Sequence, residues 1–226
     1  MVRGKSLVYL DANVLIPSVT RGLLIIGAVT SDFRVCWSEF GEAEAERHQH
    51  ERAAKISDLR SRFGWDVLVP EADAIAMSDT DPKDQPHLAA AHAAGAHLVV
   101  TENIKDFGLA DLSTLSISVV APDLFLSTRL AESSYVGALG ALANGRTRDP
   151  RTPESIHSQE VAPRLPELAE KFASTFGVPL GDPAKGAMSE VFRGFRCIRC
   201  EDAMPSSDSP LCDSCRPVSP SEMAVS

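Results

Sequence analysis

The sequence predicts an α/β fold in which a mostly parallel sheet of four or five strands lies between two layers of helices. Two observations lead to this prediction. Short apolar segments alternate with helical segments over residues 1–126, an order typical of a parallel sheet covered on both faces. Polar or acidic residues directly follow the first and fourth of the strand-like segments, and open α/β sheets collect functional groups at these strand ends.

The first strand and helix come from an apolar pattern that changes its period. Residues 7–10 are apolar and lead into Asp11, and residues 14–29 carry apolar side chains at helical spacing. Arg21 and Gly22 predict a break within this helix. Asp11, at the carboxyl end of the strand, is either a metal ligand or a helix N-cap, and the sequence pattern gives both interpretations similar weight.

A second strand at residues 33–37 leads into a long polar segment. We expect one helix from Ser38 to Gly64, because glycine is a frequent helix stop, and a third strand at residues 66–69. Glutamates are frequent early in this helix, where the positive helix N-terminus favours acids. Most of them are expected on a solvated face, and one could face a pocket.

The stretch from residue 81 to residue 107 is central to the functional prediction. Asp84 is a good N-cap for a helix over residues 85–94, which is rich in strong helix formers and is followed by Gly95. The apolar residues 98–100 then predict a buried strand. The turn after this strand carries three polar residues, Glu102, Asn103 and Asp106. A carboxylate-lined pocket is therefore expected at this strand end.

The rest of the chain divides by composition. A last strand at residues 116–120 precedes an apolar helix that ends at Gly145, and two short amphipathic helices are expected between residues 154 and 176. The predicted organisation is an α/β domain at 1–126, a helical extension at 127–176, a linker at 177–194, a metal-binding module at 195–217 and a disordered tail at 218–226.

Four of the five cysteines form one C-terminal cluster. Cys197 and Cys200 are separated by two residues, as are Cys212 and Cys215, and this paired spacing is typical of a tetrahedral four-sulfur Zn²⁺ site. The segment has few apolar residues, so we expect it to fold on binding metal and the site to be structural. Cys36 is expected as a small buried hydrophobe.

Composition limits the classes of function. The formal net charge of −9 argues against broad electrostatic binding to nucleic acid, although an acidic nuclease remains compatible if its carboxylates hold cations. No long apolar run and no signal-peptide pattern occur, so we expect a cytoplasmic protein without membrane association. Six arginines could guide a phosphate backbone, although scattered surface arginines are the commoner explanation: Arg146, Arg148, Arg151, Arg193, Arg196 and Arg199.

An ordered set of motifs carries a resemblance to a known family. DANVL follows the first strand, DPKD at residues 81–84 precedes HLAAA, and VTENIKDF ends at Phe107. Together they resemble the PIN domain of VapC-like ribonuclease toxins over residues 7–126. The resemblance implies a three-layer PIN-like nuclease domain that cleaves RNA phosphodiester bonds with Mg²⁺ or Mn²⁺. The C-terminal four-cysteine, zinc-ribbon-like module departs from a minimal toxin of this family.

The resemblance also implies site residues. By position, the acids that hold Mg²⁺ or Mn²⁺ are Asp11, Asp84 and Asp106. The family has a further catalytic glutamate early in the long helix, for which we choose Glu44, with Glu42 as the alternative. A hard divalent ion held by such oxygens lowers the pKa of its bound water and neutralises charge that develops on the phosphate.

Two polar residues resemble the supporting residues of such a site, Thr101 and Asn103, the latter at a position where many PIN domains have another aspartate. The implied partners are an RNA substrate, an antitoxin protein and a second copy of the chain. The first hypothesis is therefore the toxin of a VapBC-like system. The alternatives are a non-catalytic RNA- or protein-binding adaptor on a PIN scaffold, which would not need acids converging in a pocket, and a nuclease for ribosomal RNA processing.

Overall fold

A computed structural model provides the fold. It describes residues 5–51, 53–65, 67–73, 75–146, 149–177, 188–204 and 209–216. The expected tail at 218–226 and residues 178–187 of the expected linker lie outside the described residues.

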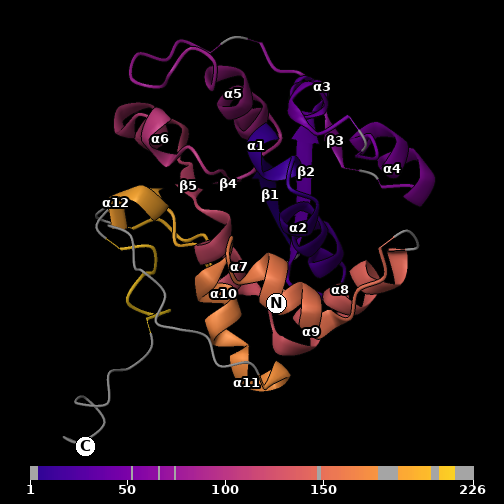
Figure 1. Cartoon of the computed structure of the whole chain (residues 1–226). Coiled ribbons are helices and arrows are strands. Elements are labelled where there is room, and N and C mark those ends of the chain that lie inside the picture. The colour runs from indigo at the N-terminus through magenta and orange to yellow at the C-terminus, as the bar shows by residue number, and fades with distance from the viewer. Residues whose placement is uncertain are drawn as a thin grey trace, which may run out of the picture.

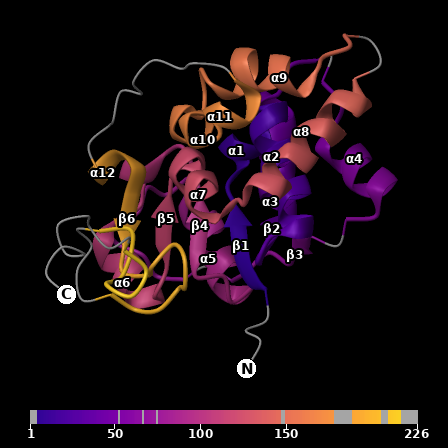
Figure 2. The same cartoon turned by 90° about the horizontal axis from the view of Figure 1, so that it is seen from below.

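A six-stranded sheet forms the centre of the protein. Its strands run in the order β3-β2-β1-β4-β5-β6, as Figure 2 shows. All neighbouring strands pair parallel except β5 and β6, which pair antiparallel. This confirms the predicted α/β class with a mostly parallel sheet. The strands are β1 (Ser6–Leu10), β2 (Phe33–Ser38), β3 (Leu68–Val69), β4 (Leu98–Val100), β5 (Ser118–Val120) and β6 (Phe192–Gly194).

The central strands are apolar on both sides, so each face of the sheet has its own core. Val8 and Leu10 of β1 point into one cluster of buried residues, whereas Tyr9 between them belongs to the other. This alternation follows from the two-residue period of a strand. Val100 of β4 joins the first cluster and Val99 joins the second.

Helices cover both faces and give three layers (Figure 1). On the first face lie α2 (Ser18–Thr30), α7 (Pro122–Arg129) and α8 (Glu132–Gly145). On the second face lie α5 (Gln85–Ala93) and α6 (Leu109–Leu115). Further elements are α1 (Ala12–Leu15), α3 (Glu39–His48), α4 (Ile56–Phe63) and the 3-10 turn η1 (Ile104–Asp106).

Three helix boundaries differ from the sequence-based expectation. The polar helix expected from Ser38 to Gly64 is divided into α3 and α4, because Gln49 is extended and Glu46 accepts hydrogen bonds from the backbone and hydroxyl of Ser57. The last apolar helix is divided at the buried, extended Leu130.

The expected break at Arg21 and Gly22 is also absent, since α2 runs through both residues. The interruption lies earlier, at Pro17, which is extended and precedes the first residue of α2. Gly22 instead permits close packing, because a β-carbon there would lie 2.5 Å from Cδ2 of Leu142 in α8. The glycine therefore serves helix packing, and proline provides the break.

The extension is helical, but its second part contains four short helical segments where two helices were expected. Its parts are α9 (Pro153–Ile156), the π-helical η2 (His157–Val161), α10 (Pro166–Lys171) and α11 (Ala173–Phe176). Asp123 of α7 accepts hydrogen bonds of 2.9 Å from the backbone N–H groups of Glu167 and Leu168 at the start of α10. The extension is thus fastened to the α/β core.

The C-terminal module packs on the sheet edge. Residues 188–194, which we expected at the end of a linker, form α12 (Met188–Val191) and β6, and β6 is the sixth strand that the sequence did not predict. Arg129 of α7 donates to the carbonyl of Ile198 at 2.9 Å and pairs with Asp32 at 3.0 Å. In the part of the chain that the structure describes, no helix is long and apolar enough to span a membrane.

Candidate functional site

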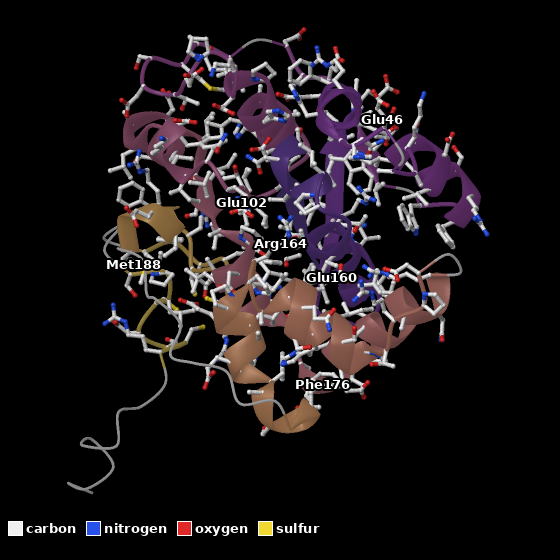
Figure 3. All side chains as sticks on the ribbon, viewed as in Figure 1. Glu46, Glu102, Glu160, Arg164, Phe176 and Met188 are labelled. Carbon is white, nitrogen blue, oxygen red and sulfur yellow. The ribbon has the colours of Figure 1, made fainter. Side chains whose placement is uncertain are left out.

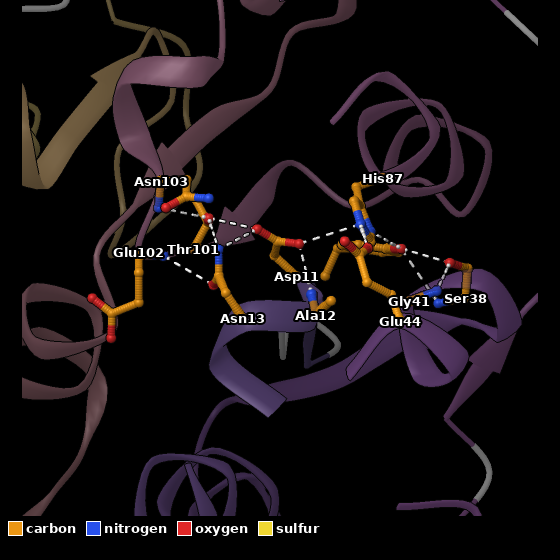
Figure 4. A network of polar contacts seen from close by, with 11 residues as sticks. Asp11, Ala12, Asn13, Ser38, Gly41, Glu44, His87, Thr101, Glu102 and Asn103 are labelled. Carbon is orange, nitrogen blue, oxygen red and sulfur yellow. Dashed lines mark hydrogen bonds and ion pairs between the residues drawn. The ribbon is translucent and has the colours of Figure 1, made fainter. Parts of the chain in front are cut away.

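Polar residues from three neighbouring strands meet at the carboxyl edge of the sheet. Asp11 follows β1, Thr101 follows β4 and Ser38 ends β2. These strands are adjacent and parallel, so their carboxyl ends lie at the same edge. Figure 4 shows the side chains that converge there.

Asp11 is the best-fixed acid of this edge. Its Oδ1 accepts a hydrogen bond from the backbone N–H of Ala12 at 2.6 Å, and its Oδ2 accepts from Asn13 at 2.8 Å and from the Thr101 hydroxyl at 2.6 Å. The side chain is 3% exposed. Asp11 is therefore both the N-cap of α1 and a buried carboxylate of the site, so the two interpretations left open by the sequence are compatible.

The two expected supporting residues contribute differently. Thr101 is fully buried and connects Asp11 with Asn13, whose Nδ2 lies 3.0 Å from the threonine hydroxyl. Asn103 has an exposed side chain, and its backbone N–H donates to the Thr101 hydroxyl at 3.0 Å. Asn13 also accepts from the backbone N–H of Glu102 at 3.1 Å. It joins the loops after β1 and β4.

His87 is a site residue that the sequence reasoning missed. Its Nε2 lies 2.8 Å from Oε2 of Glu44 and 3.4 Å from Oδ1 of Asp11, and its Nδ1 lies 3.1 Å from the Tyr9 hydroxyl. The Tyr9 hydroxyl in turn lies 2.8 Å from that of Ser38. A signal was present, because His87 follows Asp84 by three residues on the same helix, which places both on one face.

The surroundings of His87 favour its charged form. Burial lowers the pKa of His87, but the hydrogen bond to Glu44 and the charges of Asp11, Glu44 and Asp84 outweigh burial and raise it. The same hydrogen bond lowers the pKa of Glu44. In its charged form, His87 would offset the negative charges of the two carboxylates that it contacts.

The two glutamates that the sequence offered for the site occupy different surroundings. Glu44 lies beside His87 at the site. Glu42 is 7% exposed and accepts hydrogen bonds from the Trp37 indole at 2.9 Å and from both Nε and an Nη of Arg60 at 2.9 and 3.1 Å. Glu42 therefore belongs to a structural ion pair between α3 and α4, and Glu44 is the glutamate next to Asp11.

Asp84 and Asp106 complete the acidic group. Burial, followed by the charge of Asp11, raises the pKa of Asp84 to about 6, and Asp106 and Asp81 contribute while His87 opposes them. Asp84 immediately precedes α5, as expected, but its side chain makes no capping hydrogen bond. The turn η1 that carries Asp106 is joined to the same loop, since the Asp81 N–H donates to the Asp106 carbonyl at 2.8 Å. Like charges from separate segments therefore interact here.

The four C-terminal cysteines form a compact group. Among the described residues, they are the only set of three or more His, Cys, Asp or Glu side chains whose ligand atoms all lie within 4.8 Å of one another. The sulfurs of Cys200 and Cys212 are 3.6 Å apart. A tetrahedron with Zn–S bonds of about 2.3 Å has edges of about 3.8 Å, whereas a disulfide needs about 2.05 Å. The cysteine cluster could therefore hold a metal ion such as Zn²⁺, as the sequence predicted.

The arginines that we considered as phosphate guides are largely engaged within the protein. Arg146 pairs with Glu160, and Arg151 pairs with Asp149 at 3.0 Å. Arg193 and Arg196 donate to backbone carbonyl oxygens, and Arg148 lies outside the described residues.

Two further features lie near these site residues. Phe40, whose ring centre is 5.3 Å from that of His87, lines a pocket of about 210 Å³. Glu102 of the loop after β4 and Arg164 of the extension lie near one another in Figure 3, and the raised pKa of Glu102, caused by burial and by Asp123, is reduced by Arg164. The pocket is lined by Ser38, Phe40, Glu71, Ala72, Pro86 and Ala90.

Comparisons with known proteins add no assignment. No family model matches the sequence, and neither the curated proteins nor the solved structures give a match.

Proposed function

We propose that this protein is a metal-dependent endoribonuclease with a PIN-like domain at residues 1–126. The observation that carries the proposal is a buried, triply hydrogen-bonded Asp11 at the carboxyl edge of a parallel sheet, joined to Glu44 through His87 and near enough to Asp84 to interact with it by charge, as Asp106 also does. A purely structural role would not require Asp84 to lie where the charges of Asp11 and Asp106 raise its pKa.

The donor set suits a hard divalent cation. Asp11, Asp84 and Asp106 would supply carboxylate oxygens, which Mg²⁺ and Mn²⁺ prefer over sulfur or nitrogen. Such an ion, when bound, neutralises phosphate charge and lowers the pKa of water. The raised pKa of Asp84 supports this assignment, because a cation would relieve the repulsion between its charge and that of Asp11.

The protein's own residues orient the acids. Thr101 and Asn13 hold Oδ2 of Asp11 by hydrogen bonds of 2.6 and 2.8 Å. His87 holds Oε2 of Glu44 at 2.8 Å and keeps a proton at the Nε2 that faces this carboxylate. The Tyr9 hydroxyl contacts Nδ1 of His87 and so fixes the orientation of the imidazole ring. The positions of Glu44 and Asp11 are therefore set before the substrate binds.

The pocket beside His87 supports an unpaired RNA strand as the substrate. Phe40 presents an aromatic ring at the pocket wall, with its ring centre 5.3 Å from that of His87. Unpaired bases stack on such rings, whereas a paired duplex keeps its bases inside. Most of the candidate arginines form ion pairs or hydrogen bonds within the protein, which argues against a broad basic groove. The net charge of −9 agrees with this.

We further propose that the cysteines hold structural Zn²⁺ and that the chain acts as a toxin restrained by an antitoxin. A homodimer is part of this proposal by resemblance alone. The toxin role predicts growth arrest when the wild-type gene is induced in a bacterial host and none when Asp11→Asn is induced at equal protein level. Arrest by both variants would contradict it.

The nuclease proposal is tested by incubating the purified full chain with total RNA and single-stranded DNA in Mn²⁺, Mg²⁺ or EDTA. RNA cleavage is expected with either metal and none in EDTA. Asp84→Asn should abolish it, whereas Asp58→Asn on the distant α4 should not. If a folded, metal-loaded protein cuts no nucleic acid, the non-catalytic adaptor replaces the nuclease; preferential cutting of ribosomal RNA precursors would favour a processing enzyme.

A further inference from the structure

The 3-10 turn η1 is held through three consecutive carbonyl groups. The Asp106 carbonyl accepts from the backbone N–H of Asp81 at 2.8 Å. The carbonyls on either side of it, those of Lys105 and Phe107, accept from Nη1 of Arg193 at 3.2 and 2.9 Å. Arg193, from the C-terminal part of the chain, therefore donates hydrogen bonds to the backbone on both sides of Asp106.

Arg193 lies in the middle of β6, and β6 is held on the sheet by its own contacts. Val119 of β5 is its register partner, and the backbone N–H of Ala121 donates to the carbonyl of Val191 at 2.8 Å. Phe192 beside it is 1% exposed. The preceding helix α12 packs against η1.

The cysteine module continues directly from this strand. Ser118 of β5 and Arg196 exchange hydrogen bonds, with the Arg196 N–H donating to the serine hydroxyl at 2.7 Å. Cys197 follows and is fully buried in the same core as Phe192. A segment with so little apolar surface is held together by its metal. Loss of the metal would therefore loosen β6 from its C-terminal side.

We propose that Arg193 is a positioning residue for Asp106, and that the four-cysteine module, by holding β6 on the sheet, sets the affinity of the acid site for its divalent cation. The proposal rests on the proposed function for its cation. Arg193 supplies charge-assisted donors to two carbonyls, which are stronger than neutral hydrogen bonds. The module thereby acts on a site to which it contributes no ligand.

The experiment compares the zinc-loaded full chain with three variants. Arg193→Gln removes the charged fork, Arg193→Lys retains the charge, and Arg62→Gln is a matched control on the surface of α4. Hydrogen exchange of residues 103–108 and Mn²⁺ binding by titration calorimetry are measured for each. Arg193→Gln should speed exchange in this segment and weaken Mn²⁺ binding by about 5-fold or more. Arg193→Lys should recover part of both effects, and Arg62→Gln should change neither.

The second part of the experiment removes zinc from the wild-type chain. The wild-type chain stripped by a zinc chelator should show the same faster exchange at residues 103–108 and the same weaker Mn²⁺ binding, while the sheet core over β1 and β4 stays protected. Unchanged exchange in Arg193→Gln, or faster exchange with unchanged Mn²⁺ affinity, would overturn the positioning role. If the wild type binds no Mn²⁺ and cuts no RNA, both the proposed nuclease function and the effect of Arg193 on the acid site fail. If the wild type binds Mn²⁺ and the variants behave like it, only the effect of Arg193 fails.

Discussion

His87 is a basic side chain among the acids of the candidate site. Its side chain is 1% exposed, yet it contacts Glu44 and Asp11 with one nitrogen and Tyr9 with the other. A buried imidazole with two carboxylates on one side lowers their mutual repulsion. The site can therefore fold before a cation arrives.

The two neighbouring glutamates of α3 give a matched pair of substitutions. We expect Glu44→Gln to lower the RNA cleavage rate on the order of 100-fold with little change in stability, because it removes a charge from the site. Glu42→Gln should instead destabilise the fold by about 1–3 kcal/mol, because it leaves the Arg60 pair incomplete, with cleavage nearly unchanged.

Urea unfolding and single-turnover cleavage of both variants measure this difference. Glu39→Gln on the exposed face of the same helix serves as the control and should change neither quantity. The reverse pattern, with cleavage lost in Glu42→Gln and stability lost in Glu44→Gln, would contradict the assignment of Glu44 to the site.

Among the elements, the junction between α7 and α10 depends on one titrating carboxyl. Burial raises the pKa of Asp123 to about 6, against the two hydrogen bonds from Glu167 and Leu168 that lower it. The folded state thus binds this proton more tightly than the unfolded state. The resulting stabilisation is complete below the unfolded pKa and is lost as the pH rises through about 6.

We therefore expect the unfolding free energy of the wild type, relative to Asp123→Asn, to fall between about pH 4 and about pH 6. Paired urea titrations at several pH values measure it. Because asparagine does not titrate, a slope of this difference with pH reports the titration of Asp123 in the wild type. A difference that stays constant, or that grows with pH, would contradict the raised pKa.

The β5–β6 pairing depends on a glycine. Gly194 has φ of +134°, and a β-carbon there would lie 2.6 Å from the backbone Cα of Ser118. Gly194→Ala is expected to detach β6, which should appear as faster hydrogen exchange and proteolysis across residues 188–204. Gly137→Ala in α8, where a β-carbon meets nothing within 4 Å, should stabilise the protein by about 0.5–1 kcal/mol. Equal protection of β6 in both variants would contradict the account.

Strands were easier to predict than helix boundaries. The apolar runs of β1, β2, β4 and β5 stand out because these strands are buried on both faces. The division between α3 and α4 has no glycine or proline signal and depends on Glu46 reaching Ser57. The three residues of β6 are too few to show an alternating apolar pattern. They form a strand because they pair with β5, which the local sequence does not reveal.

For the whole molecule, the sequence located the candidate site through strand ends and could not supply its contacts. Asp11 was found because it follows an apolar strand, whereas Thr101 was implied by the family resemblance. The contact of His87 with Tyr9 requires α5 to pack on the second face of the sheet, which local periodicity does not encode. The packing of the cysteine module against α7, through Arg129, is likewise a tertiary feature.

The overall arrangement places two chemically distinct centres on one sheet. Hard carboxylates lie at the carboxyl ends of β1 and β4, and soft thiolates lie beyond β6 at the opposite end of the β1-β4-β5-β6 order. Zn²⁺ prefers sulfur ligands and Mg²⁺ prefers oxygen ligands, so the two groups suit different ions. In the function that we propose, the thiolates support the fold and the carboxylates carry the chemistry.

The most direct test of the central claim is the single-turnover cleavage rate of a labelled single-stranded RNA across a series of Mn²⁺ concentrations. We expect a rate that saturates with Mn²⁺ for the zinc-loaded wild type and for Glu39→Gln. For Asp11→Asn, we expect a loss on the order of 100-fold or more at every concentration. Cleavage by Asp11→Asn at the wild-type rate, or wild-type cleavage that persists in EDTA, would contradict the assignment of the acid group as a metal-dependent nuclease site.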